Sequence, residues 1–297
     1  MSVSEIHALL ALLDDPDDTV YNHVRDQLIS KGNAVLPYVN QEVSKSPDCD
    51  LFLGRLEKLR GELQRTDTKT AVVEWKGQAS PSLWEGVLLV QKATYPEMDL
   101  EASRQEFDRL KRDVWLELND ELTALEQIRI INHMLYSMRG VQSLRRVQNI
   151  ASEALPSFVL KERKGNALGL GLLYLCLTET LNLPIRGVNL PNHFILAYCD
   201  ESHVKERSSS SAQSGILFYV NPFSNGSVIG PKEVAEFLSH LQTDETAKQW
   251  RPCNAVEIIH RLVQHVAFSL REAGELTREM ELIQSFEPLL SSLEDAE

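Results

Sequence analysis

The segment LGLGLLYLCLTETL, from Leu168 to Leu181, constrains the fold more than any other part of the chain. It is apolar nearly all round at helical spacing, and a helix of that kind has to be buried on every side. Gly169 and Gly171 lie inside it, although each glycine costs about 1 kcal/mol relative to alanine in a helix interior. Close approach of a strand or of another helix explains such glycines. The segment therefore predicts the central helix of a large core.

Three short β-rich runs follow this helix. They read LPIRGVNL, HFILAYC and GILFYVNPF, and proline, asparagine and glycine bound them. Runs of this kind in close succession are typical of an antiparallel meander. We therefore expect an α+β fold that is mostly α: a buried central helix against a small antiparallel sheet, with helical extensions at the N-terminal and C-terminal ends.

Helical periodicity divides the chain into three expected regions. Residues 1–79 read as helix, turn, helix, turn, helix and are similar to one HEAT-type unit. Stable solenoids need several units, so a helical cap is the preferred interpretation. Residues 80–245 hold three amphipathic helices and the core. Residues 246–297 form an αα-hairpin, similar to a tetratricopeptide unit, with its break near Gly274.

A linker is expected between the first two regions. The stretch RTDTKTAVVEWKGQASPS loses apolar periodicity and places the boundary near Ala79.

Charge and cysteine content limit the function classes. The chain has 297 residues and a formal net charge of −13, which repels a phosphate backbone or an anionic leaflet. No apolar stretch reaches the ~20 residues that cross a bilayer, and the N-terminal residues lack the basic region of a signal peptide. The four cysteines form no C-x-x-C pair, and free thiols fit a reducing cytoplasm. We expect a cytoplasmic protein without metal, cofactor, nucleic acid or membrane insertion.

The core offers three stations at which cysteine-dependent acyl transfer is organised. Such chemistry needs a thiol at a helix N-terminus, a histidine on a facing strand and an acid on the next strand. The residues at these stations are Ala167, His193 and Asn221. A methyl group cannot attack a carbonyl, and an amide cannot stabilise an imidazolium as a carboxylate does. Covalent acyl transfer is therefore not expected.

A family resemblance rests on the stretch RKGNALGLGLLYLCLTETLNLPIRGVNLPNHFILAY, with YVNPFSNG after it and LWEGVLLVQKATYPEMDLEASRQEFDRL before it. The chain resembles the bacterial transglutaminase-like proteins once described as invasion-gene regulators, from Leu83 to Leu290. The resemblance implies a transglutaminase-like core with a tetratricopeptide-like tail. It places the superfamily's cysteine at Ala167, its histidine at His193 and its acid at Asn221. Members of this family commonly lack the thiol.

Other residues of the core do not restore the nucleophile. Cys176 lies nine residues along the central helix, which is about 180° around the axis and ~13 Å from Ala167. Asn166 is expected to cap the helix. As polar contacts for a ligand we expect Arg163, Asn166, Asn189 and His193.

Three functions remain open at this stage. The leading hypothesis is a non-catalytic protein-binding or scaffolding module. The alternatives are an enzyme that uses His193 as a general base without a cysteine, and a helical adaptor whose core is a rigid spacer. The partner is expected to be a protein. We also predict that the His193 ring lies within about 8 Å of the Ala167 methyl group, because catalytic partners need near hydrogen-bond reach.

Overall fold

The chain folds into two compact units. The computed structural model describes residues 3–45, 50–145, 150–190, 193–200, 215–230, 232–234, 236 and 252–294. One unit is Met1–Gly77 with Ile283–Glu297, and the other is Gln78–Leu282. Helix α13 (Leu276–Glu294) begins in the second unit and ends in the first. The predicted domain limits at residues 79 and 245 stay predictions.

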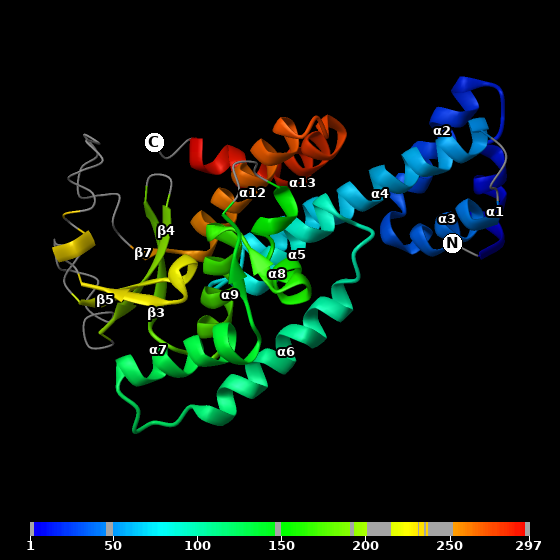
Figure 1. Ribbon diagram of the computed structural model, residues 1–297. Coiled ribbons are helices and arrows are strands. Elements are labelled where there is room, and N and C mark those ends of the chain that lie inside the picture. Colours follow the sequence, from blue (N-terminus) through cyan, green and yellow to red (C-terminus); the bar gives the residue numbers. More distant parts are fainter. Residues whose placement is uncertain are drawn as a thin grey trace. The chain divides into compact units, whose positions relative to one another are not determined.

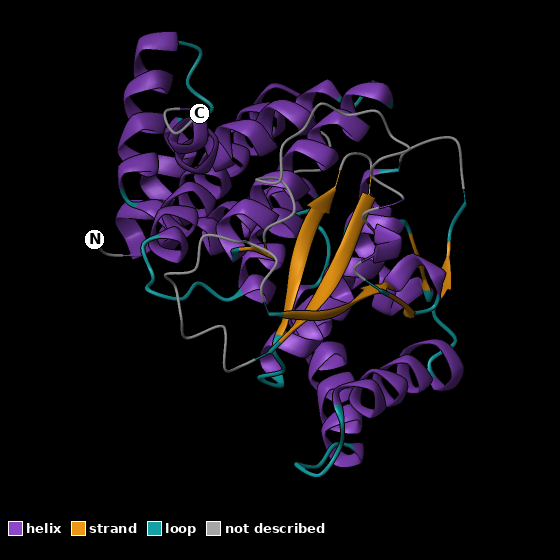
Figure 2. Cartoon of the chain, turned by 90° about the vertical axis from the view of Figure 1, so that its left-hand side faces the viewer, coloured by secondary structure: helices purple, strands orange, loops and turns teal. Residues whose placement is uncertain are grey.

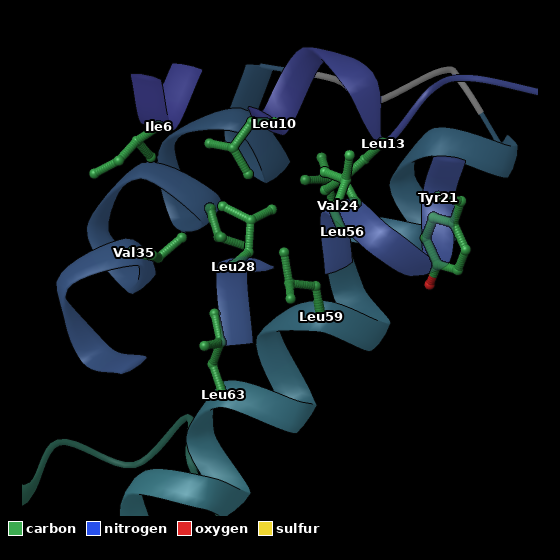
Figure 3. Close-up of a cluster of buried hydrophobic side chains, with 11 residues drawn as sticks. Ile6, Leu10, Leu13, Tyr21, Val24, Leu28, Val35, Leu56, Leu59 and Leu63 are labelled. Atoms are coloured by element: carbon green, nitrogen blue, oxygen red, sulfur yellow. The ribbon is translucent and has the colours of Figure 1, made fainter. Parts of the chain in front are cut away.

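The first unit is helical. Its elements are α1 (Val3–Leu12), α2 (Asp18–Ser30), the 3-10 helix η1 (Gly32–Val35), α3 (Leu36–Lys45) and α4 (Asp50–Lys76) (Figure 1). The predicted alternation of helices and turns in this region is confirmed. A cluster of buried apolar side chains holds the four helices together, and Figure 3 shows these side chains converging between them. Arg55 of α4 binds the carbonyl groups just after the C-terminal end of α1. Its Nη1 donates to the carbonyl oxygens of Leu13 and Asp15 at 2.9 and 2.6 Å.

The predicted linker is wrong in its first two-thirds, because α4 continues without a break to Lys76. Thr68, Val72 and Trp75 are buried at helical spacing. The Thr68 hydroxyl donates to the carbonyl oxygen of Gln64 at 2.8 Å, so a polar residue occupies a buried position without an unsatisfied group. Because a threonine occupies this buried position, the sequence does not show the apolar periodicity of the helix here.

The second unit contains a five-stranded antiparallel sheet in the order β6-β5-β4-β3-β7. The strands are β3 (Ile185–Leu190), β4 (His193–Cys199), β5 (Ile216–Asn221), β6 (Ser227–Ile229) and β7 (Pro252–Cys253). The predicted meander is confirmed, and β6 and β7 extend it at its two edges. A separate parallel pair joins β1 (Gln142–Ser143) to β2 (Lys164–Gly165).

In Figure 2 the helices of this unit lie behind the sheet, whose other face is turned toward the viewer. Their bounds are α5 (Leu83–Thr94), α6 (Leu100–Glu117), α7 (Ala124–Asn132), the π-helix η2 (His133–Met138), the 3-10 helix η3 (Ala151–Ala154), α8 (Pro156–Glu162), α9 (Ala167–Thr180), the 3-10 helix η4 (Pro222–Ser224) and α12 (Ala255–Glu272). Helix α9 is the predicted central helix and packs on β3 and β4. The α+β, mostly α fold class is confirmed. No helix within the described ranges combines the length and apolarity needed to cross a membrane.

The two glycines of α9 are explained by close approach. A Cβ atom at Gly171 would lie 2.4 Å from the Phe194 ring of β4. A Cβ atom at Gly169 would lie 2.3 Å from the carbonyl oxygen of Glu153 in η3. The helix therefore touches the sheet at one glycine and the backbone of η3 at the other.

Candidate functional site

The start of α9 is capped as the sequence predicts. Asn166 has extended backbone, and its Oδ1 accepts a hydrogen bond from the backbone N–H of Gly169 at 2.9 Å. Its own backbone N–H donates to the carbonyl oxygen of Glu153 at 3.2 Å. Ala167, half-buried, is the first residue of the helix. The helix N-terminus, with its partial positive charge, thus carries a methyl group.

His265 of α12 completes the cap. Its Nε2 lies 3.2 Å from Nδ2 of Asn166. Because the amide nitrogen can only donate, Nε2 accepts, and the imidazole is neutral with its proton on Nδ1. Burial lowers the pKa of His265, and the charge of Arg261 lowers it further. Sequence reasoning missed this contact, since 99 residues separate the two side chains and no local pattern connects them.

Arg261, one turn before His265, binds the end of the β3–β4 pair. Its guanidinium donates to Oδ1 of Asn189 at 3.0 Å and to the carbonyl oxygen of His193 at 2.9 Å. The same group lies 5.6 Å from the centre of the Phe194 ring. Burial lowers the pKa of Arg261. Two residues predicted as ligand contacts, Asn189 and His193, are therefore brought together by an arginine that the sequence did not single out.

Strand alternation bears on the direction of the His193 side chain. Phe194 faces α9 at Gly171, and neighbouring strand residues point to opposite faces. Ile195 belongs to a cluster on the far face of the sheet, and His193 has the same parity as Ile195. This alternation favours the face away from Ala167. The convergence of the three stations accordingly stays a prediction.

Asn221 ends β5 and caps the turn that follows. Its Oδ1 accepts from the backbone N–H of Phe223 at 3.1 Å. The predicted tight turn at Asn225 and Gly226 is confirmed, since both residues have positive φ. Asn221 pairs with Ser227 of β6 across this turn.

Polar side chains of α7, η2 and α9 hold this turn in place, and sequence reasoning missed them as well. Nδ2 of Asn132 donates to the carbonyl oxygen of Gly226 at 2.8 Å, and the Tyr136 hydroxyl donates to that of Pro222 at 2.8 Å. The Tyr174 hydroxyl of α9 donates to Oδ1 of Asn132 at 3.2 Å. Burial raises the pKa of Tyr136 and Tyr174, which stay protonated donors. Tyr136 projects from the π-helix, a distortion that is often found near functional sites.

Arg163 lies in a separate ion network. It ends α8 in the left-handed conformation with φ of 58°, and its Nη2 lies 3.2 Å from Oε1 of Glu106. Arg139 binds the same carboxylate at 2.6 Å and Asp113 at 2.6 Å. These contacts join α6 to the approach to α9.

The cysteines near the core are poor nucleophiles. Cys176 and Cys199 are buried, and burial raises the pKa of both thiols. Reactivity requires the thiolate, which neither residue forms near neutral pH. Across the described part of the chain, no group of three His, Cys, Asp or Glu side chains is arranged to hold a metal ion.

Comparison with known proteins agrees with this architecture. The profile of the transglutaminase-like superfamily matches residues 101–264, which are 164 of the 297 residues. The chain therefore belongs to the transglutaminase-like superfamily.

Named relatives include proteins from bacteria and animals. A UPF0162 protein of Vibrio cholerae is 29% identical over 156 residues, 52% of this chain and 53% of that protein, so the chain spans about half of its length. The UPF0162 protein YchA of Escherichia coli K12 is 24% identical over 69% of this chain and 74% of YchA. Human F-box only protein 21 is 25% identical over 55% of this chain and 24% of its own length. No solved structure matches the chain.

Proposed function

We propose that this chain is a transglutaminase-like protein without acyl-transfer activity that works as a protein-binding or scaffolding module. The observation that carries the proposal is Ala167 at the first position of α9, the position at which the family resemblance places the superfamily's cysteine. A helix N-terminus activates a cysteine by stabilising its thiolate, and a methyl group gives it nothing to stabilise. The cap also leaves no polar atom of Asn166 without a partner, because Oδ1 serves Gly169 and Nδ2 serves His265.

The engagement of the polar side chains favours a protein partner over a small molecule. Three of the expected contact residues are bonded within the unit: Asn166 to His265, Asn189 to Arg261 and Arg163 to Glu106. A small ligand would have to break these bonds, and each broken bond leaves a partly buried group unsatisfied. A protein partner can instead cover the exposed surface around them, including the exposed His193.

Two further features support a module. In human F-box only protein 21 the aligned segment is 24% of a much longer chain, so related sequence occurs there joined to other parts. Helix α12, the first helix of the hairpin that resembles a tetratricopeptide unit, packs on α5 and η3 and adds a helical surface to the core.

A kinetic comparison tests the catalytic half of the proposal. Purified wild-type chain and the His193→Ala variant are assayed with a glutamine-containing donor peptide and a primary amine, with ammonia release and amine incorporation followed together. The expected result is that both proteins equal the buffer background. Turnover by the wild type that His193→Ala abolishes would overturn the proposal in favour of a general-base enzyme.

A restored site tests whether the frame of the enzyme persists. Ala167→Cys combined with Asn221→Asp is expected to fold, because aspartate also accepts a hydrogen bond from the backbone N–H of Phe223. The new thiol at the start of α9 is expected to titrate below the ~8.5 of free cysteine. A normal or raised thiol pKa in the folded variant would mean that the electrostatic frame has been lost as well.

The binding half is tested by native mass spectrometry of the tagged full chain purified from its own cells. A stoichiometric protein companion is the expected result. A bound small molecule in place of that protein would contradict the proposal.

A further inference from the structure

The corner between α6 and α7 exposes three apolar side chains. Trp115 and Leu116, on the last turn of α6, are 61% and 68% exposed, and Leu125, on the first turn of α7, is 44% exposed. Figure 1 shows the loop between these helices at the outer end of the pair. We call residues 113–126 the α6–α7 corner.

This exposure does not serve the core. Helix α6 buries Phe107, Leu110 and Val114 at spacings of three and four residues, and Trp115 lies beside that stripe rather than in it. Trp84 stacks on Phe107 and is buried, as is Trp75, so tryptophan elsewhere in the described ranges is used for packing. A single exposed apolar residue is ordinary, but three around one loop, one of them tryptophan, mark an interaction surface.

From Asp113 onward the corner carries only negative charge, and Lys111 and Arg112 precede it directly on α6. Its 14 residues include five carboxylates and no lysine, arginine or histidine. Asp113 is paired with Arg139, and Glu126 caps α7 through Thr123. The other three carboxylates, on Glu117, Asp120 and Glu121, are exposed, and no ion pair to them occurs within the described ranges. They are available to an incoming cation.

We propose that the α6–α7 corner docks a basic amphipathic helix of a partner protein. The apolar face of such a helix covers Trp115, Leu116 and Leu125, and its lysine or arginine side chains reach the three carboxylates. Like charges oppose the alternatives: a second acidic corner, an anionic membrane and nucleic acid are all repelled. The inference goes beyond the site at α9 and does not depend on the chemistry there, so either can fail alone.

Fluorescence anisotropy with the full-length chain tests the proposal. The probe is a labelled helical peptide of about 18 residues, five turns, with leucine on one face and lysine on the other. Its comparator has every lysine replaced by glutamate. The lysine peptide is expected to bind, more weakly as salt rises, and the glutamate peptide is not.

Two variants locate the binding. Trp115→Ala with Leu116→Ser is expected to weaken the lysine peptide about tenfold or more, the effect of removing central interface anchors. Replacing Glu117, Asp120 and Glu121 by Gln, Asn and Gln is expected to weaken binding and to flatten its salt dependence. The matched control, Phe268→Ala with Glu272→Gln on α12, removes an exposed apolar side chain and a carboxylate elsewhere and is expected to bind as the wild type does.

Each contrary outcome overturns the proposal. No binding by the wild type, equal affinity of the corner variants, or equal binding of the glutamate peptide would refute the stated partner chemistry. Sedimentation that detects a dimer lost on Trp115→Ala would assign the surface to a second copy instead. Circular dichroism checks the fold of every variant, and Leu116→Ser alone carries the test if the Trp115 variant does not fold, since its side chain is the most exposed of the three.

Discussion

Replacing Gly169 by alanine tests how tightly α9 is held against its surroundings. Intrinsic helix propensity alone predicts that alanine stabilises the helix by about 1 kcal/mol. The structure predicts the opposite sign, because the new Cβ would lie 2.3 Å from the carbonyl oxygen of Glu153 and 3.2 Å from the backbone of Ala154. These are backbone atoms, which cannot swing away as the end of a side chain can.

The expected loss follows from three terms. Forcing a methyl group into a filled core costs about 1–3 kcal/mol. Pushing η3 away also strains the bond from the Asn166 backbone N–H to Glu153, and a lost hydrogen bond costs about 1 kcal/mol. Subtracting the propensity gain of about 1 kcal/mol leaves a net destabilisation of about 2 kcal/mol.

Hydrogen exchange of the α9 amides measures this loss within the unit that contains the helix. The matched control is Gly54→Ala in α4, where a Cβ would meet nothing within 4 Å. Gly54→Ala is expected to raise the free energy of unfolding of the unit that contains α4 by up to about 1 kcal/mol. The same substitution should therefore change the free energy of unfolding with opposite signs at Gly54 and at Gly169. Unchanged or slower α9 exchange in the Gly169 variant would show that η3 yields easily and would refute the packing argument.

Three further predictions concern the polar groups of the same unit. The folded chain lowers the pKa of His265 below its ordinary 6.5, so the unfolded chain binds the proton more readily. The contribution of His265 to the free energy of unfolding is therefore present above pH 6.5 and is lost as the pH falls below that value. His265→Gln should flatten the pH dependence of the unfolding free energy between pH 7 and 5, and an unchanged pH profile would contradict this. Gly226→Ala places a Cβ atom against the Asn132 side chain at a residue whose φ is 70°. In a double-mutant cycle with Asn132→Ala, the double variant should therefore lose less unfolding free energy than the sum of the two single variants, whereas additive losses would exclude the clash. Iodoacetamide under native conditions should modify the half-buried Cys253 well before the fully buried Cys176, as peptide mass mapping will show, and the reverse order would indicate that α9 opens.

The sequence predicted the elements whose signals are local. An all-round apolar run identified α9, and an asparagine before it identified the cap at Asn166. Branched and aromatic runs identified β3, β4 and β5, while Gly274 identified the break between α12 and α13. Each signal lies within a few residues of the structure it specifies, because helix periodicity, capping and turn chemistry act over one or two turns of chain.

Only the tertiary structure decided which polar groups meet at the start of α9 and at the end of the β3–β4 pair. The His265 imidazole reaches Asn166 across 99 residues, and Arg261 reaches Asn189 across 72, through the packing of α12 on the core. The sequence likewise concealed the end of α4, where a satisfied hydroxyl on Thr68 is buried in place of an apolar side chain. Periodicity reports which face of an element is buried but not what that face meets. The partner of each side chain depends on how distant elements pack together, and this is a property of the whole fold.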